Sequence, residues 1–472
     1  MADHIRPDLC VVGAGALGIA LAQHGRSLGA QVTLVDRGVP EVGDGPQQNL
    51  RLAALQASAA RAHGMRHADA LGLGRAEPKI SMRLVQERAK ALAEAQSVMT
   101  SHERLAALGI EMLRGATTFI DQNTLMVGDI QIRPRTIVLA PGGVAQLPPI
   151  PGLERIDFFT ADSILENARK LTHLLVIGGT GTALGLAQAF ARLGSEVTLV
   201  PHGPLLPAHD PEAAALLFEA LGAEGVRIMA GANVREILPR AQGTGVVVDT
   251  SGGDEVALDV SHVLVATDVV PDLASLLPEK ARLRAADGLL GETSNRRIRL
   301  VGAAAGINEW PYALAQGRAV VEHALFGTSG ARLTPQPHLV MTDPPLAQNG
   351  RIAGRARRAR AGGALLRASL AENEQARASG MAEGLAKVEI SGDGKLLGAA
   401  LVGPGAAEMA AVLALAQQRD IPLHALSGLC LPDPNLLASV VSLGEQAAAL
   451  RPVSRWAKRW RAARRLVAFG SR

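Results

Sequence analysis

The chain has 472 residues, of which 48% are hydrophobic and 19% charged, which excludes a disordered protein and predicts two or three domains with substantial cores. Its two cysteines, Cys10 and Cys430, are too few for a disulfide framework or a thiol-bound metal cluster. The net charge of +4 is small, residues 1–8 carry no signal pattern and no apolar run reaches about 18 residues, so we expect a cytoplasmic protein that does not bind nucleic acid.

The first predicted element is an apolar strand at residues 9–12 that leads into a glycine turn with the pattern Gly-x-Gly-x-x-Gly. Glycines at this spacing let the backbone approach a pyrophosphate at a helix N-terminus, where free N–H groups favour the anion. The next strand ends at an acid about 20 residues further on, which is placed to bind a ribose hydroxyl. The sequence therefore predicts a dinucleotide site formed by Gly13, Gly15, Ala16, Leu17, Gly18, Asp36 and Arg37.

The elements that follow are weaker in pattern. Residues 50–115 are rich in Ala, Leu, Arg and Glu at helical spacing and predict two helices. Alternating apolar residues at 117–132 predict the short strands of a small meander, and residues 136–140 predict another buried strand. The proline-rich residues 148–152 form a stiff connector and a candidate domain boundary.

Beyond this connector, strand, glycine turn, helix and strand recur in the same order. The residues of the second turn that could bind a nucleotide are Gly178, Gly179, Thr180, Gly181 and Ala183. Thr180 stands where a glycine would admit the pyrophosphate, and its side chain blocks close approach. The next strand ends at Pro201 and His202, neither the acid expected for NAD nor an arginine for a 2′-phosphate. These residues favour a folded unit without a ligand, and NAD(P)H use is doubtful.

The last part of the chain alternates strands and helices. Strand patterns occur around 246–260, at 262–266 and at 299–302. In residues 330–450, strand patterns at 386–390 and 396–402 precede an alanine-rich helix at 406–418.

Taken in order, these units resemble the flavoprotein disulfide reductases, the family of dihydrolipoamide dehydrogenase and mercuric reductase. Phrases that carry the resemblance include Ile150-Pro151-Gly152, Met341-Thr342-Asp343-Pro344 and Gly403-Pro404-Gly405, and it covers nearly the whole chain. It implies an α/β fold with two Rossmann-type dinucleotide-binding domains, the second inserted in the first, and a C-terminal α+β dimerisation domain. It also implies FAD on the first unit, NAD(P)H on the second, and a homodimer.

The resemblance divides the chain into five parts. These are the first part of the FAD-binding domain at 1–152, an NAD(P)-binding-like domain at 153–284, the second part of the FAD-binding domain at 285–332, a dimerisation domain at 333–450 and a basic amphipathic tail at 451–472.

The residues of the family's chemistry are missing. Family members carry a Cys-x4-Cys pair on the helix that faces the flavin, whereas residues 43–51 contain no cysteine, which excludes disulfide reductase activity. The family's His and Glu near the C-terminus correspond to Asp433 and Ala438, and its acid near the nicotinamide corresponds to Gly185. Cys430 lies close to this stretch and is either a lone thiol or, as we expect, a core cysteine beside a turn.

The flavin site is kept in part. The family's Gly-Asp after the last strand of this domain is Gly302-Ala303, so the carboxylate is absent, and its Ala-Thr-Gly turn is Ala140-Pro141-Gly142. The first glycine turn and its acid are intact, so we expect FAD to bind through its phosphates and adenine ribose. No metal site and no catalytic residue is predicted.

The tail combines tryptophans and arginines at helical spacing. Such a helix either lies on an anionic membrane surface or docks a partner protein, or it covers the protein's own domain.

Two functions remain open from the sequence. One is an FAD-dependent oxidoreductase without a dithiol, which passes electrons from the flavin to an unknown acceptor. The other is a non-catalytic relative that acts as a scaffold, sensor or subunit partner.

Overall fold

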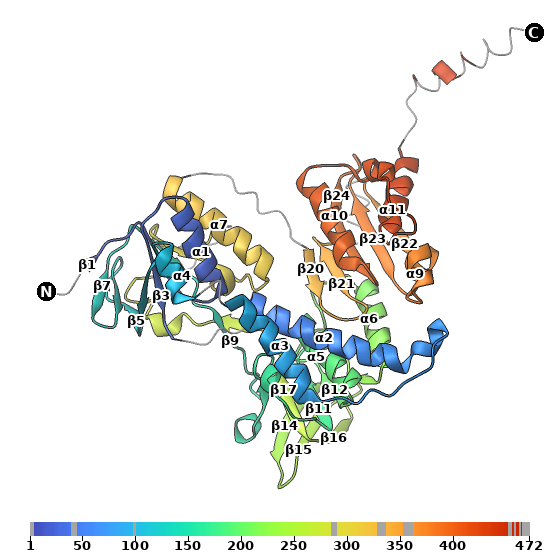
Figure 1. Ribbon diagram of the computed structural model, residues 1–472, viewed down its shortest axis with the longest axis horizontal. Coiled ribbons are helices and arrows are strands. Elements are labelled where there is room, and N and C mark those ends of the chain that lie inside the picture. The colour runs from blue at the N-terminus through green and yellow to red at the C-terminus, as the bar shows by residue number, and fades with distance from the viewer. Residues whose placement is uncertain are drawn as a thin grey trace, which may run out of the picture. The chain divides into compact units, whose positions relative to one another are not determined.

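The computed structural model describes residues 4–38, 45–97, 101–284, 290–327, 337–352 and 362–451, together with 456, 459–461 and 464. Contacts between segments divide the chain into two compact units, drawn in Figure 1. The larger unit comprises Met1–Pro207, Phe218–Gln336 and Val340–Thr342, and the smaller one Ala208–Leu217, Pro337–Leu339 and Asp343–Arg472. The finer division into five parts stays a prediction.

The larger unit contains two sheets in which every strand pair is parallel. The first has the strand order β19-β8-β2-β3-β4. Its strands are β2 (Leu9–Val12), β3 (Val32–Asp36), β4 (Glu111–Arg114), β8 (Thr136–Leu139) and β19 (Ile298–Leu300). Strands β2 and β8 are buried along their whole length, as central strands covered on both faces must be.

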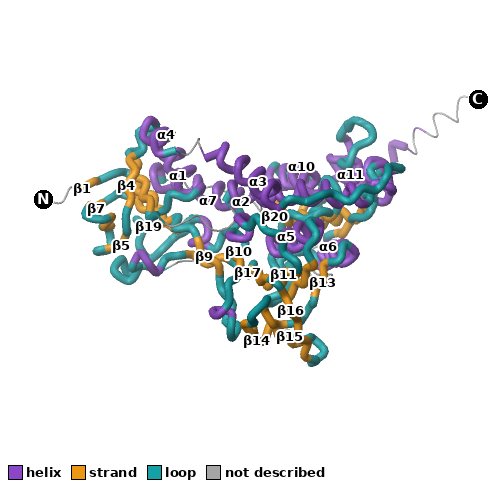
Figure 2. Tube along the Cα trace, turned by 60° about the horizontal axis from the view of Figure 1, so that its bottom comes forward, coloured by secondary structure: helices purple, strands orange, loops and turns teal. Residues whose placement is uncertain are grey.

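Alternate residues of β2 lie on opposite faces of the sheet and belong to different hydrophobic cores. Leu9 and Val11 pack against helices α1 (Ala16–Ser27) and α7 (Trp310–Phe326), which lie side by side in Figures 1 and 2. Cys10 and Val12 pack on the other face. That face is covered by the predicted meander, β5 (Thr117–Phe119), β6 (Leu125–Val127) and β7 (Ile130–Ile132), which β1 (His4–Ile5) extends.

The second parallel sheet has the order β10-β17-β11-β12-β13. Its strands are β10 (Phe159–Thr160), β11 (His173–Ile177), β12 (Glu196–Val200), β13 (Val226–Ile228) and β17 (His262–Val265). Helix α5 (Gly181–Arg192) is buried along most of its length and follows β11. An antiparallel sheet shares a hydrophobic core with β11 and β17 and lies beside them in Figure 2. It consists of β14 (Asn233–Pro239), β15 (Thr244–Asp249) and β16 (Glu255–Val260).

Residues 50–115 contain more than the two helices predicted there. Those two are α2 (Pro46–Arg66) and α3 (Met82–Ser97), which pack against each other. The prediction is wrong in leaving out α4 (His102–Ala107) and the edge strand β4. Helix α4 has six residues, too few to show a period, and it begins where the Ser101 hydroxyl accepts a hydrogen bond from the Arg104 N–H. A short antiparallel pair, β9 (Gly143–Ala145) and β18 (Val269–Pro271), completes the larger unit.

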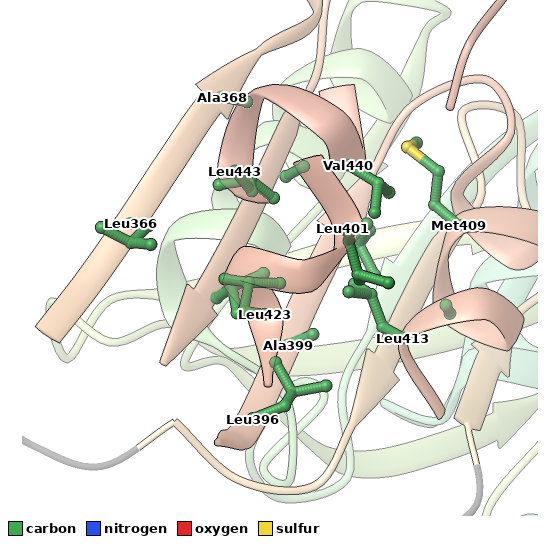
Figure 3. Close-up of a cluster of buried hydrophobic side chains, with 14 of the residues drawn as sticks. Leu366, Ala368, Leu396, Ala399, Leu401, Met409, Leu413, Leu423, Val440 and Leu443 are labelled. Carbon is green, nitrogen blue, oxygen red and sulfur yellow. The ribbon is translucent and has the colours of Figure 1, made fainter. Parts of the chain in front are cut away.

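The smaller unit is built on one five-stranded sheet with the order β20-β21-β24-β23-β22. Its strands are β20 (Pro337–Val340), β21 (Leu346–Asn349), β22 (Ala364–Ser369), β23 (Leu385–Ile390) and β24 (Leu396–Val402). Helices α10 (Ala406–Gln418) and α11 (Ala438–Ala449) cover one face, and α9 (Glu374–Ala378) follows β22. Figure 3 shows their apolar side chains meeting those of the strands, with Leu401, Leu413, Val440 and Leu443 in the same core. The predicted helix at 406–418 is confirmed.

A network of charges lies on β23 at residues that alternate with its core residues. The Lys387 ammonium is 2.7 Å from a carboxylate oxygen of Asp210 and 2.8 Å from one of Glu212. Asp210 also caps helix α6 (Pro211–Ala223), because its other oxygen accepts from the N–H groups of Glu212 and Ala213. Arg367 on β22 pairs with Glu212 at 2.9 Å. These ion pairs attach residues 208–217 to the sheet of the smaller unit.

Substituting Glu212 with glutamine is expected to change how stability depends on pH. Hydrogen bonds from Arg367 and then Lys387 lower the pKa of Glu212 from 4.5 to about 2. The ionised carboxylate therefore adds stability above pH 4.5, and this part is lost as the pH falls towards 2. The Glu212 side chain is 42% exposed, so we expect E212Q to cost less than about 1 kcal/mol at pH 7. Urea unfolding at several pH values checks this, and equal acid slopes for the two proteins would contradict it.

Two features are absent from the described residues. None of their helices combines the length and the apolar character needed to cross a membrane. No group of three or more His, Cys, Asp or Glu side chains among them is arranged to hold a metal ion.

Candidate functional site

The first predicted nucleotide site lies at the carboxyl ends of four neighbouring strands. Gly13 follows β2, Ala140 follows β8, Val301 follows β19 and Asp36 ends β3. In a parallel sheet these ends lie on one edge. The chain continues from β2 to β3 on one side, while β8 joins β2 on the other. Ligands of open α/β sheets bind at such a reversal of strand order.

Two glycines of the first turn, Gly13 and Gly18, leave no room for a side chain. Gly13 has φ +114°, and a Cβ added to it would lie 1.9 Å from the carbonyl oxygen of Ala140. A Cβ at Gly18 would lie 1.7 Å from the carbonyl oxygen of Gly13. Gly15 is the N-cap of α1 in an extended conformation, and no side chain caps the helix there. The turn therefore brings closely approaching backbone without side chains to a helix N-terminus, an arrangement that fits a pyrophosphate.

The second flavin segment lies against the start of α1. Gly302 has φ +59°, and a Cβ added there would lie 2.6 Å from Cδ2 of Leu17. Residues Gly302–Ala305 form a single 3-10 turn, in which Ala303 offers no carboxylate. Gly142 has φ +73° with open space around it. The structure thus brings Leu17, Gly302 and the 140–142 turn to the same edge as Gly13.

The two residues at the end of β3 have different surroundings. Asp36 is held by two hydrogen bonds of 2.8 Å, from the N–H of Gly38 and from Nε of Arg114. These two bonds orient the carboxylate and leave lone pairs for a ribose hydroxyl. The Arg37 guanidinium instead pairs with Asp272 and donates to the Ser275 hydroxyl at 2.6 Å. The Arg37 side chain is thus engaged with Asp272 and Ser275, which belong to a segment far along the chain from the glycine turn.

The second glycine turn differs from the first at position 180, where a threonine stands in place of the second glycine. Gly178 has φ +151°, and a Cβ there would lie 2.2 Å from the carbonyl oxygen of Ala266, as at Gly13. Thr180, however, caps α5: its hydroxyl accepts from the Ala183 N–H at 3.2 Å and donates to the Ala266 carbonyl at 3.1 Å. A side chain therefore takes the helix N–H group that a pyrophosphate would use. A Cβ at Gly181 would lie 3.2 Å from Val340, and one at Gly179 3.0 Å from a carbonyl oxygen.

Gly185 on α5 has no room for the acid that family members carry there. A Cβ at this residue would lie 2.4 Å from the Met341 carbonyl oxygen and 2.7 Å from Nε2 of Gln56. Gln56 of α2 donates a hydrogen bond to that carbonyl. The backbone of residue 341 and an amide therefore fill the space that a carboxylate side chain would need.

Sequence reasoning missed two polar residues at the start of α2. Gln48 Oε1 and Arg51 Nε are buried and have no hydrogen-bond partner among the described residues. The other Arg51 nitrogens are engaged, one with Glu166 at 2.7 Å and one with the Leu165 carbonyl at 2.5 Å. Both residues belong to the stretch 43–51 that lacks the cysteine pair, of which 43 and 44 lie outside the described residues. The signal in the sequence that could have identified Gln48 and Arg51 is that polar residues stand in the stretch where the family has its cysteine pair.

The two cysteines are unsuited to dithiol chemistry. Cys10 is fully buried in β2, and burial, with a smaller effect of Glu111, raises the pKa of its thiol to about 12. A thiol that stays protonated is a poor nucleophile. The expectation that Cys430 is a core residue is wrong, because Cys430 is exposed. It follows the short 3-10 helix Leu423–Gly428, where no strand or α-helix buries it.

The stretch that corresponds to the family's C-terminal His and Glu carries neither residue. Asp433 and Ala438 are both exposed. Asn435 is instead engaged structurally, since its side chain accepts from the Leu437 N–H and its carbonyl accepts from Asn373.

Family models match both parts of the chain. Residues 7–317 match the pyridine nucleotide-disulphide oxidoreductase model, and residues 336–442 match the dimerisation domain of the same enzymes. The chain belongs to the pyridine nucleotide-disulphide oxidoreductase family. This confirms the resemblance, the fold class and the presence of a dimerisation domain. Members of the family are FAD-dependent oxidoreductases that use NAD(P)H.

Several curated proteins are similar over most of this family member. Mercuric reductase of Streptomyces lividans is 28% identical over 86% of this chain and 89% of its own length. Dihydrolipoyl dehydrogenase of Thermus scotoductus is 28% identical over 93% and 96%. Mercuric reductase of Staphylococcus aureus is 26% identical over 73% of this chain, and the match spans 64% of that protein, less than two thirds.

Solved structures share the fold of this family member. An HOCl-induced flavoprotein disulfide reductase from Escherichia coli superposes with a TM-score of 0.79 at 22% identity, covering 94% of this chain and all of the other. LpdA from Mycobacterium tuberculosis gives a TM-score of 0.80 at 24% identity over 94% and 99%.

Proposed function

We propose that this family member is an FAD-dependent oxidoreductase that works without a redox-active dithiol and passes electrons from the flavin directly to an acceptor outside the chain. The observation that carries the proposal is the first glycine turn, in which Gly13 and Gly18 leave no room for a side chain and Gly15 provides no side-chain cap for α1, in a chain that lacks the Cys-x4-Cys pair. The binding residues we propose for FAD are Gly13, Gly15, Ala16, Leu17, Gly18, Asp36, Ala140, Gly142, Gly302 and Ala303.

The protein's own residues have definite tasks in this proposal. The turn at 13–18 binds the pyrophosphate through backbone N–H groups, and Asp36, already oriented by Arg114 and Gly38, accepts from the adenine ribose. When bound, FAD supplies the electron-transfer chemistry. Gln48 and Arg51 occupy the helix that faces the flavin in the family, so in our proposal they take the side that the cysteine pair would occupy.

Two observations favour a second function, that of a non-catalytic scaffold, sensor or subunit partner. Thr180 caps α5 at the nucleotide turn, and Gly185 has no room for an acid. Both features argue against a conventional nicotinamide site, so in the first function the electrons come to the flavin from a weakly bound NAD(P)H or from another donor. A homodimer through residues 336–442 is part of either function, and light scattering that gave the mass of a monomer would contradict it.

Substituting Cys430 with serine tests whether any thiol takes part. The proposal predicts that the purified flavoprotein, reduced by dithionite and mixed with a dye acceptor without oxygen, is reoxidised at the same rate in C430S as in the unchanged chain. The reason is that Cys10 is buried with a raised pKa, so Cys430 is the accessible thiol. A rate lowered tenfold or more would contradict direct transfer, and a chain that takes up no FAD would favour the non-catalytic function.

A further inference from the structure

Two of the three tryptophans of the chain lie together near its C-terminal end. Trp456 is 74% exposed and Trp460 is 48% exposed. Their rings stack with centroids 6.5 Å apart, and the Arg464 guanidinium lies 4.5 Å from the centroid of the Trp460 ring. Residues 456, 459–461 and 464 are helical, so a separation of four puts both indoles on one face. Large exposed aromatic side chains on one face mark an interaction surface.

The charge of the chain is segregated around the same segment. Residues 451–472 contain eight Lys and Arg and no acid, and residues 351–367 contain six Arg and no acid. These 14 of the 48 basic residues leave 34 against 44 acidic residues in the rest of the chain. Both basic runs belong to the smaller unit. A chain with a net charge of +4 therefore has a negative main part and two strongly positive segments.

The sequence of this segment also has the spacing of an amphipathic helix. Apolar residues stand at 453, 456, 460, 463 and 467, separated alternately by three and four residues, and the basic residues stand between them. A segment that had only basic charge could bind any polyanion and would show no preference for a lipid surface. Apolar residues at this spacing, two of them tryptophans, favour insertion at the boundary between lipid headgroups and acyl chains, where the indole ring is stable.

We propose that the face carrying Trp456, Arg459, Trp460, Arg461 and Arg464 binds an anionic lipid surface, with the two indoles inserted at the headgroup level and the arginines against the anionic headgroups. The association is peripheral, since no helix among the described residues is able to cross a membrane. It does not depend on the flavin, so it stands or fails separately from the proposed function.

Vesicle binding by the full chain tests this proposal. We expect the chain to cosediment with phosphatidylcholine vesicles that contain roughly a quarter phosphatidylglycerol, and to bind them at least about tenfold more strongly than vesicles of phosphatidylcholine alone. High salt should weaken this binding, because it screens the electrostatic attraction between the arginines and the headgroups. The double substitution W456A/W460A and the triple substitution R459Q/R461Q/R464Q should each weaken binding about tenfold or more. Both sets change exposed side chains, and an unchanged melting temperature would show that the fold is intact.

A matched control distinguishes this segment from apolar exposure in general. Leu415 on α10 of the same unit is 54% exposed, and L415A should bind the anionic vesicles like the unchanged chain. Equal binding to neutral and anionic vesicles would overturn the proposal. Unchanged binding by W456A/W460A would also overturn it, because the segment would then be a general polyanion contact that needs no apolar insertion.

Discussion

Substituting Gly13 with alanine is expected to abolish FAD binding. The residue has φ +114°, and the new Cβ would lie 1.9 Å from the backbone oxygen of Ala140, so one of two central strands must shift. Backbone strain alone costs about 1–3 kcal/mol, and the clash adds to it. The shift would also move the turn whose N–H groups are proposed to hold the pyrophosphate. The ratio of flavin absorbance to protein absorbance after purification measures the effect.

Two matched glycines control for strain and for loss of stability. Gly29 has φ +89° with no atom within 4 Å of an added Cβ, so G29A carries the backbone strain without the clash and should retain FAD. G178A places the same kind of clash, 2.2 Å from the Ala266 oxygen, in the second turn. It should lower the melting temperature and leave the flavin bound. A G13A protein that retains one FAD per chain would show that the first turn is not the flavin site.

Substituting Lys387 with methionine is expected to be strongly destabilising. Its side chain is 8% exposed, and the ammonium lies 2.7 Å from the carboxylate of Asp210, whose side chain is 4% exposed. Removing one partner leaves the other as an uncompensated buried charge, which costs about 3–5 kcal/mol. Because Asp210 also caps α6, the loss should appear as earlier unfolding of the smaller unit in urea, followed by circular dichroism.

Removing both charges of the Lys387–Asp210 pair should cost less stability than removing the charge of Lys387 alone. D210N/K387M removes both charges and keeps an oxygen that can cap α6, so it should recover part of the stability that K387M loses. The exposed pair Lys395–Asp420, 50% and 61% exposed at 3.0 Å, provides the surface control. K395A should cost no more than about 1 kcal/mol. A K387M protein within that margin of the unchanged chain would contradict this account.

The sequence was sufficient to predict those features of the structure that depend on residues close together in the chain. The buried strands of both parallel sheets are short apolar runs bounded by turns, and β2 and β8 lie where the runs at 9–12 and 136–140 predicted them. The turn at 13–18 depends on local backbone conformation, which the glycine spacing specifies. The cap made by Thr180 joins residues three apart, so the obstruction expected there has a local cause.

Contacts between residues distant in the sequence could not be predicted. Arg37 pairs with Asp272, 235 residues away, and Gln56 bonds to the backbone of Met341, 285 residues away. Lys387 meets Asp210 across 177 residues. No spacing rule connects such positions, because the fold alone brings them together. The exposure of Cys430 was missed for the same reason, since burial depends on which elements cover a turn.

Anaerobic reductive titration of the purified protein tests the central claim most directly. A flavin accepts two electrons, and a redox-active disulfide accepts two more, so an enzyme with both consumes four per FAD. With one buried and one exposed cysteine in the chain, we predict a visible flavin spectrum that is bleached by two electrons per FAD. Uptake of four electrons would contradict dithiol-free chemistry, and a colourless protein that takes up no added FAD would contradict flavin binding.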